Sequence, residues 1–354
     1  MKRFEVALKK FLLSLFLGFN KHRRNNSEPK FSKNSKILFI RLNRIGDALV
    51  TTPLIYEVKK QIQCKTYILA DSKNHFVFQK FLADEVIVFE KGIINFFTLL
   101  KKLNSLQLDA VVDTHDDVST TVTFMIRYLK VPFKIALEKQ NHSVFTHTVK
   151  KLDPVNNHVV DRILELGKLL GIEIDNNNSN IQYFPSGQSM GKAIKFVNTH
   201  FPEKKFLLGI NISAGSEARF WGISKFKKLM EFCNKLSIDV LLLSTTRDLH
   251  HAFQITLEKK KIFYTPSFDE FAAIVSQVDL LFSPDTATIH LASIHKKPVF
   301  GVYVQYNTDD MVWSPYRSDF DCVVTKEPTL DNVEFDKVIS KFEPFLLKHI
   351  NCKQ

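Results

Sequence analysis

Residues 36–53 read KILFIRLNRIGDALVTTP, and this stretch sets a pattern that the rest of the chain repeats. Its apolar run, Ile37–Ile40, predicts a buried strand. A polar loop containing Gly46 and Asp47 follows. Thr52-Pro53 then marks a helix start, because threonine caps helices well and proline suits the first helical position. The stretch therefore predicts a strand, a loop and a helix in direct succession.

The same alternation continues toward the carboxyl end of the chain. Further predicted strands are Thr66–Leu69, Val86–Phe89, Ala110–Asp113, Lys134–Ala136, Leu207–Ile212, Val240–Leu243, Lys261–Tyr264, Leu280–Phe282 and Val299–Tyr303. Helical patterns separate them, at Thr52–Gln61, Ile93–Leu103, Val118–Leu129, Val159–Leu170, Lys225–Leu236, Leu249–Lys259, Phe268–Gln277 and Thr286–Ile294. This rhythm predicts α/β architecture with parallel sheets that are covered by helices on both faces.

The chain length favours two such domains. It has 354 residues, and domains of this class average roughly 150. The polar residues 172–186 are the predicted crossing, which divides an amino-terminal domain, 36–186, from a carboxyl-terminal domain, 187–354. Two doubly wound domains would place their strand carboxyl ends, where such sheets bind ligands, around one cleft.

Charge and cysteine usage exclude several classes of protein. The formal net charge is +12, but residues 1–34 hold nine Lys and Arg against two Glu, so that +7 of it belongs to the tail. The remaining +5 over 320 residues does not indicate a nucleic-acid binder. The four cysteines form no CxxC pair, which argues against a zinc ribbon and a disulfide scaffold. The sequence contains no run of 18 apolar residues, so it predicts no membrane-spanning helix.

The amino-terminal segment, residues 1–35, has a composition of its own. Apolar residues fall at helical spacing on one face, at Phe4, Leu8, Phe11, Leu12, Leu15 and Phe19, and the basic run Lys21-His22-Arg23-Arg24 closes the segment. This pattern predicts an amphipathic helix that lies on an anionic membrane surface through residues 1–24. Packing on the protein's own body is the alternative, and a secretion signal fits poorly because no small-residue cleavage site follows.

Asp47 is the first candidate for chemistry, since it follows a glycine turn at the end of a strand. If the next helix begins at Thr52, the Asp47 carboxylate is free for other work. If the helix begins at Ala48, Asp47 is in a position to cap it. The local sequence leaves these two interpretations open.

The second domain offers an anion site at the start of a helix. Residues 283–290, SPDTATIH, follow a buried strand, and the first N–H groups of the helix, at Thr286 and Ala287, lack partners within the helix. Together with the helix dipole they could bind a diphosphate. Asp285 could accept hydrogen bonds from sugar hydroxyls, and His290 lies one turn along the same face. A capped helix with a partly buried histidine is the alternative.

Two further loops carry polar side chains. In residues 213–221, SAGSEARFW, the small residues Ser213 and Gly215 would let the backbone approach an anion, and Arg219 could neutralise it. The run Asp113-Thr114-His115-Asp116-Asp117 suggests a divalent metal. No second ligand pair completes the set, so a polar wall of the cleft and no metal site is expected.

Taken together, these segments resemble glycosyltransferase family 9, the lipopolysaccharide heptosyltransferases. Five parts of the chain, spanning roughly residues 36–316, carry the resemblance in order: the stretch 37–54 with its Gly-Asp turn, Ala110–His115, Gly209–Trp221, the Asp285-Thr286-Ala287-Thr288-Ile289-His290-Leu291-Ala292 signature, and Trp313-Ser314-Pro315. Two departures stand out. Ala287 occupies a position where the family usually has glycine, and Val302-Tyr303-Val304 replaces a usual Phe-Gly.

The resemblance implies a GT-B fold of two Rossmann-like domains and assigns residues to roles. It implies Asp47 as the general base, with Arg44 and His115 on the acceptor side. On the donor side it implies a group of eight residues: Ser213, Gly215, Arg219, Asp248, Asp285, Thr286, Ala287 and His290. Asp248 falls near the nucleoside.

The implied reaction is an inverting transfer of heptose from ADP-heptose, without metal or cofactor, to a hydroxyl of the lipid A-linked inner core. The enzyme would be cytoplasmic and peripheral on the inner membrane. Two alternatives remain open: a transferase of another nucleotide-sugar or an epimerase of the same fold, and a non-catalytic nucleotide-sugar-binding protein.

Overall fold

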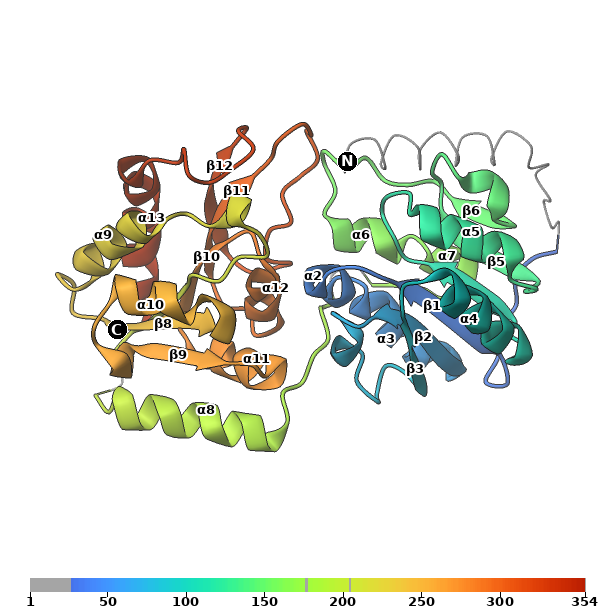
Figure 1. Ribbon diagram of the computed structural model, residues 1–354, viewed down its shortest axis with the longest axis horizontal. Coiled ribbons are helices and arrows are strands. Elements are labelled where there is room, and N and C mark those ends of the chain that lie inside the picture. Colours follow the sequence, from blue (N-terminus) through green and yellow to red (C-terminus); the bar gives the residue numbers. More distant parts are fainter. Residues whose placement is uncertain (1–26, 176–177, 204, 354) are drawn as a thin grey trace. The chain divides into compact units, whose positions relative to one another are not determined.

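The computed structural model describes residues 27–175, 178–203 and 205–353, and the chain divides into two compact units between Gln182 and Tyr183. We call the part up to Gln182 unit 1 and the part from Tyr183 unit 2 (Figure 1). The predicted amphipathic helix of residues 1–24 lies outside the described residues. None of the helices in the described part is long and apolar enough to cross a bilayer.

Unit 1 contains one parallel sheet of six strands in the order β3-β2-β1-β4-β5-β6. The strands are β1 (Lys36–Arg41), β2 (Lys65–Asp71), β3 (Glu85–Phe89), β4 (Ala110–Asp113), β5 (Phe133–Leu137) and β6 (His147–Val149). All six pair in parallel, and the central residues of β1 are fully buried. Burial on both faces explains why these strands are continuous apolar runs without alternation.

The helices of unit 1 lie between its strands along the chain, except that the last two follow β6. They are α2 (Ile45–Leu49), α3 (Thr52–Ile62), α4 (Ile93–Ser105), α5 (Thr120–Tyr128), α6 (Val159–Leu164) and α7 (Gly167–Leu170). Helix α3 has Pro53 in its first turn, as predicted. Two findings differ from the predictions: a separate short helix, α2, precedes α3, and the helix expected over Val159–Leu170 is divided into α6 and α7.

Unit 2 repeats the topology, with strand order β12-β11-β10-β7-β8-β9. Its strands are β7 (Leu207–Asn211), β8 (Asp239–Thr245), β9 (Ile262–Thr265), β10 (Leu280–Pro284), β11 (Val299–Val304) and β12 (Phe320–Thr325). The helices are α8 (Gly187–His200), α9 (Ile223–Cys233), α10 (Leu249–Ile255), α11 (Phe268–Gln277), α12 (Ala287–Ile294) and α13 (Phe335–Lys353). The predicted pair of doubly wound α/β domains is confirmed.

The strand order decides where each unit can bind a ligand. In unit 1 the order reverses between the neighbouring strands β1 and β4, and in unit 2 it reverses between β7 and β10. Loops that leave two such strands diverge to opposite faces and open a crevice at the carboxyl edge of the sheet. The loops that carry Asp47 and Arg219 follow β1 and β7, and those with His115 and Asp285 follow β4 and β10.

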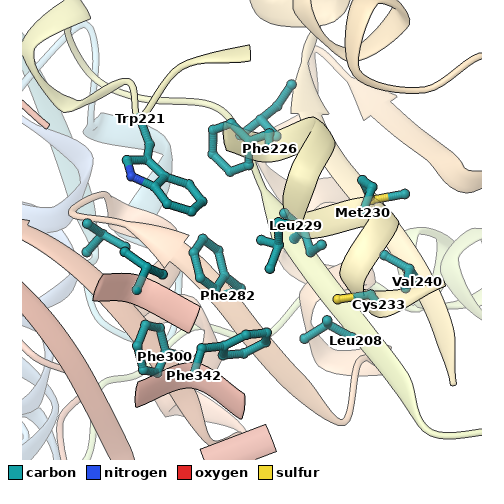
Figure 2. Packing of buried hydrophobic residues seen from close by; sticks show 14 of the residues in the cluster. Leu208, Trp221, Phe226, Leu229, Met230, Cys233, Val240, Phe282, Phe300 and Phe342 are labelled. Atoms are coloured by element: carbon teal, nitrogen blue, oxygen red, sulfur yellow. The ribbon is translucent and has the colours of Figure 1, made fainter. Parts of the chain in front are cut away.

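An aromatic core supports the loop after β7. Trp221 is fully buried at the end of that loop, and its indole N–H donates a hydrogen bond to the Val333 carbonyl at 2.9 Å. Figure 2 shows Trp221 near Phe226 and Phe282, with ring centroids 5.4 and 5.5 Å away. Phe226 and Phe282 thus pack around Trp221, which fixes the end of the loop.

Candidate functional site

Asp47 lies inside the short helix α2, at its third position. One carboxylate oxygen accepts a hydrogen bond from the Arg44 backbone N–H at 3.1 Å, and the other accepts from the Arg41 guanidinium at 2.9 Å. The side chain of Arg41 is buried, whereas that of Asp47 is 19% exposed. The helix begins at Ile45, and not at Ala48 or only at Thr52 as the two interpretations of the local sequence had it. Asp47 supports the first turn of this helix, and part of its carboxylate remains exposed.

The Arg41 guanidinium ties the Asp47 turn to the neighbouring strand. Its Nε donates to the Asp47 carbonyl at 2.9 Å, and Nη1 donates to the carbonyl of Thr114, just beyond β4. Three anchors of this kind on one buried planar cation leave the Asp47 carboxylate little freedom to turn. The loop residue Asn43 has φ +94°, in the left-handed region that asparagine tolerates better than most residues.

His115 and Asp113 support the same loop from β4. The His115 Nε2 accepts the Leu42 backbone N–H at 3.2 Å, so Nδ1 carries the proton, which it shares with Asp113 at 2.6 Å. Both ring nitrogens are therefore engaged within the protein. The Lys139 ammonium lies 2.8 Å from the other oxygen of Asp113. The predicted acceptor-side histidine acts in this structure by holding the loop that leads to Asp47 and the exposed Arg44.

Charge balance explains why a fully buried carboxylate is stable there. Burial alone would raise the pKa of Asp113, but the Lys139 ammonium and the His115 contact more than offset burial and hold that pKa below its ordinary value. The next acid, Asp116, pairs with Lys151 and Arg162, each at 3.1 Å. Asp113 and Asp116 are thus held in internal ion pairs, while Asp117 is exposed, and no cluster arranged for a metal ion occurs in the part of the chain that the structure describes.

In unit 2 the start of α12 presents backbone donors. Thr286 is the N-cap residue, and its hydroxyl accepts the Thr288 N–H at 3.3 Å. Asp285 bonds back to the sheet through its own N–H. Among the described residues, the N–H groups of Thr286 and Ala287 find no acceptor. The two amides predicted to bind a diphosphate are therefore unpaired in the structure. Both residues are half-buried.

Asn211, the last residue of β7, joins the two loops of unit 2. Its side-chain amide donates to the Ser213 carbonyl and to the hydroxyls of Ser283 and Thr286, and its oxygen accepts the Ser213 N–H. Asn211 is not among the residues predicted for the site. The signal was present, because a polar side chain ends an otherwise apolar strand at the switch point of the sheet.

Arg219 and Asp285, two of the predicted donor-side residues, form an ion pair. The Arg219 Nε donates to an Asp285 oxygen at 2.7 Å, and both side chains are about one-quarter exposed, at 26% and 23%. The two terminal nitrogens of Arg219 have no other partner within the described ranges. The pair therefore holds a guanidinium beside the start of α12, with its outer donors available to an anion.

Ser213 and Asp248 connect this region to a small hollow. The Ser213 hydroxyl accepts the Thr245 N–H at 2.8 Å, and the Thr245 hydroxyl donates to Asp248 at 3.0 Å. Burial opposes ionisation of Asp248, but the Arg247 guanidinium holds its pKa below the ordinary value. The hollow is small and open to solvent, and it is lined by Ala214, Ser216, Glu217, Phe220, Arg247, Asp248 and His251. Gly215 is exposed between two of these lining residues.

His290 and Tyr303 lie behind the start of α12. His290 is 3% exposed, and its ring centroid is 6.3 Å from that of Trp313. The Tyr303 ring folds back over Gly301, where an added Cβ would lie 2.2 Å from the ring. Burial and the nearby Asp285 raise the pKa of Tyr303 well above its ordinary value, so it stays a neutral phenol.

The Tyr303 hydroxyl is buried and has no partner among the described protein groups. An unsatisfied buried hydroxyl costs stability, so Tyr303→Phe is expected to raise the free energy of unfolding by roughly 1 kcal/mol. Urea unfolding measures the change. The matched change Gly301→Ala, which inserts a methyl group into the ring's place, should lower stability. A loss of stability in Tyr303→Phe would show that the hydroxyl is hydrogen-bonded in the folded protein.

Comparisons with known proteins agree on one family. The family model of glycosyltransferase family 9 (heptosyltransferase) matches residues 96–342, a range that begins after Asp47. The lipopolysaccharide core heptosyltransferase OpsX of Haemophilus influenzae is 23% identical over 88% of this chain and 91% of its own. A family 9 glycosyltransferase structure from Veillonella parvula has a TM-score of 0.74 at 19% identity, covering 91% of this chain and all of that one. The structure of E. coli heptosyltransferase WaaC with ADP has a TM-score of 0.66 at 14% identity, covering 89% and 99%.

Proposed function

This chain belongs to glycosyltransferase family 9, the heptosyltransferases, and from that premise we propose that it transfers heptose from ADP-heptose to a hydroxyl of the lipid A-linked inner core of lipopolysaccharide. It is a glycosyltransferase with two Rossmann-like domains of the GT-B type. The observation that carries the proposal is the pair of unpaired amides at Thr286 and Ala287 beside Arg219, because these groups match the charge of a departing diphosphate.

In the proposed reaction the acceptor oxygen attacks the anomeric carbon and forms the new C–O bond. The bond from that carbon to the diphosphate breaks, and the nucleoside diphosphate leaves with the electron pair. The acceptor proton passes to the Asp47 carboxylate. Arg41 and the Arg44 N–H support this role, since they orient the carboxylate while leaving an exposed edge for the acceptor hydroxyl.

The donor-side residues divide the remaining work. Ser213 and Gly215 let the backbone after β7 come close to the diphosphate, and Asn211 fixes that loop to the Thr286 cap. We assign the hollow with Asp248 to the nucleoside, and we assign Asp285 and His290 to the sugar side. Within unit 2, charge on the diphosphate is met by Arg219 and the helix start, and we assign no metal or organic cofactor to the site.

The acceptor places the enzyme at a membrane. We propose that it is peripheral on the cytoplasmic face of the inner membrane, with residues 1–24 bound to anionic lipid, and that nucleic acid is not a partner. The amphipathic and basic pattern of that segment supports the proposal.

Ala287 and Tyr303 both depart from the family pattern beside the proposed diphosphate. Another nucleotide-sugar is therefore the second candidate for the donor. A panel of ADP- and UDP-sugars, with mass analysis of the product, tests the donor directly. Transfer of heptose from ADP-heptose supports the proposal. Transfer of another sugar, or conversion of the nucleotide-sugar without any acceptor, would replace it with a different transferase or an epimerase.

Arg219→Ala is expected to weaken donor binding by roughly 10- to 100-fold, the usual range for one charge-assisted contact. The Asp285 carboxylate would then lose its partner and repel the diphosphate, which adds to the loss. Calorimetric titration with ADP measures the change. Lys348→Ala, which removes an exposed and ion-paired cation of the same unit, is the control and should bind normally. Unchanged affinity in Arg219→Ala would make the loop structural only.

A further inference from the structure

The first turn of α4 exposes three large apolar side chains. Ile93 and Ile94 are 79% and 81% exposed, and Phe97 is 61% exposed. Spacings of three and four residues place Phe97 beside both isoleucines on one face of the helix. The other face, with Leu99, Leu100 and Leu103, is buried against unit 1. Isolated exposed apolar residues are common in proteins, but a contiguous set of three is not.

Helix formation does not explain these residues. The start of α4 has Gly92 at the N-cap and no side-chain cap, so Ile93 and Ile94 occupy positions where acidic or capping side chains would stabilise the helix. Apolar residues that destabilise the helix start and bury no surface within the unit indicate that this part of the surface contacts another partner.

The charges around this turn favour an anionic surface. Residues 90–102 contain three lysines and one glutamate. Lys101 lies one turn beyond Phe97 on the same face and has no carboxylate partner among the described residues. Lys91 is exposed just before the helix, and Lys102 pairs with Glu85. An apolar tip flanked by unpaired lysines is suited to the headgroup region of an anionic bilayer, where the lysine ends stay in water.

The position of the turn in unit 1 relates it to the site. Only residues 90–92 separate α4 from β3, so Ile93 lies at the carboxyl edge of the sheet. The loop with Asp47 leaves the same edge from β1, two strands away, or roughly 10 Å at the usual strand spacing. A membrane contact at this edge would bring a lipid-linked acceptor to the edge that carries Asp47.

We propose that the first turn of α4, through Ile93, Ile94 and Phe97, inserts into the interface of an anionic lipid bilayer. This contact is separate from the one proposed for residues 1–24. The inference builds on the proposed lipid-linked acceptor, but its test measures vesicle binding and not sugar transfer, so that the two proposals can fail separately.

The test compares the full chain with the triple variant Ile93→Ser, Ile94→Ser and Phe97→Ser in co-sedimentation with vesicles of phosphatidylglycerol and phosphatidylcholine. The substituted side chains are exposed, so folding should be unaffected. The expected result is a partition coefficient lower by roughly 10- to 100-fold. The control carries Phe253→Ser and Leu257→Ser, two exposed apolar residues of unit 2, and should bind like the parent.

A second measurement detects insertion even if residues 1–24 dominate the affinity. Ile94→Trp places an indole at the tip, and brominated lipids should quench its added fluorescence beyond any quenching of the parent, whose own tryptophans are the fully buried Trp221 and the partly buried Trp313. Unchanged partition without quenching would overturn the proposal. A change of oligomeric state in the triple variant, with vesicle binding intact, would overturn it in favour of a contact between copies of the chain.

Discussion

Asp47→Asn is expected to slow sugar transfer by roughly 10²–10⁴, the usual contribution of a general base, while donor affinity stays within a few-fold. The amide is nearly isosteric and can still accept one hydrogen bond, but it cannot take up the acceptor proton. Donor affinity should persist because all the proposed diphosphate ligands, Arg219 and the amides of Thr286 and Ala287 among them, belong to unit 2.

The difficulty with this variant is that Asp47 also supports its own turn through Arg41 and the Arg44 N–H. Three measurements separate the two roles. Thermal unfolding reports any loss of structure, Asp117→Asn removes an exposed carboxylate near the same edge and should transfer normally, and added formate should partly restore Asp47→Ala if the missing group is a base. Near-normal transfer by Asp47→Asn would remove Asp47 from the mechanism.

Local patterns predicted the fold well because parallel strands buried on both faces are unmistakably apolar. The strand predicted at Ala110–Asp113 and the helix predicted at Phe268–Gln277 match the structure residue for residue. The predictions omitted β6, which has three residues, α8, whose helical residues are mostly polar, and the last two elements, β12 and α13. The elements β6 and α8 are stabilised by tertiary packing, which a local pattern does not contain. The helix α13 does contain a local signal, because its buried residues Val338, Phe342 and Leu346 fall at helical spacing.

The candidate site shows a similar division. The start of α12 was predictable, because a strand followed by Asp-Thr and an apolar helix defines unpaired amides locally. The direct contacts of Asp47 with Arg41 and the Arg44 N–H are local, but the support behind them was not predictable, since Arg41 reaches the Thr114 carbonyl and the Leu42 N–H reaches His115 only in the folded sheet. Lys139 reaches Asp113 across 26 residues and Asn211 reaches Thr286 across 75. No spacing rule links residues at such separations; only the strand order makes them neighbours.

Lys139→Met is expected to destabilise unit 1 by about 3–5 kcal/mol at neutral pH, because it leaves the fully buried Asp113 carboxylate without its ammonium partner. The methionine fills similar volume, so the loss is electrostatic and not a cavity effect. Urea unfolding followed by circular dichroism measures it, and Lys130→Met, at an exposed lysine of the same unit, is the control and should be near neutral.

The pH dependence of this loss identifies its cause. In the parent the pKa of Asp113 lies below its unfolded-state value of about 3.9, so the pair contributes stability above that pH and loses it as the pH falls toward the folded-state pKa. In Lys139→Met only the His115 contact opposes burial, so the pKa of Asp113 rises above its value in the parent and the variant loses less stability as acidification protonates the carboxyl. The difference between parent and variant should therefore shrink steadily below neutral pH. If the difference in free energy of unfolding between parent and variant stays constant with pH, the loss is due to packing. The loop that Asp113 supports through His115 would then be held in place by packing and not by charge.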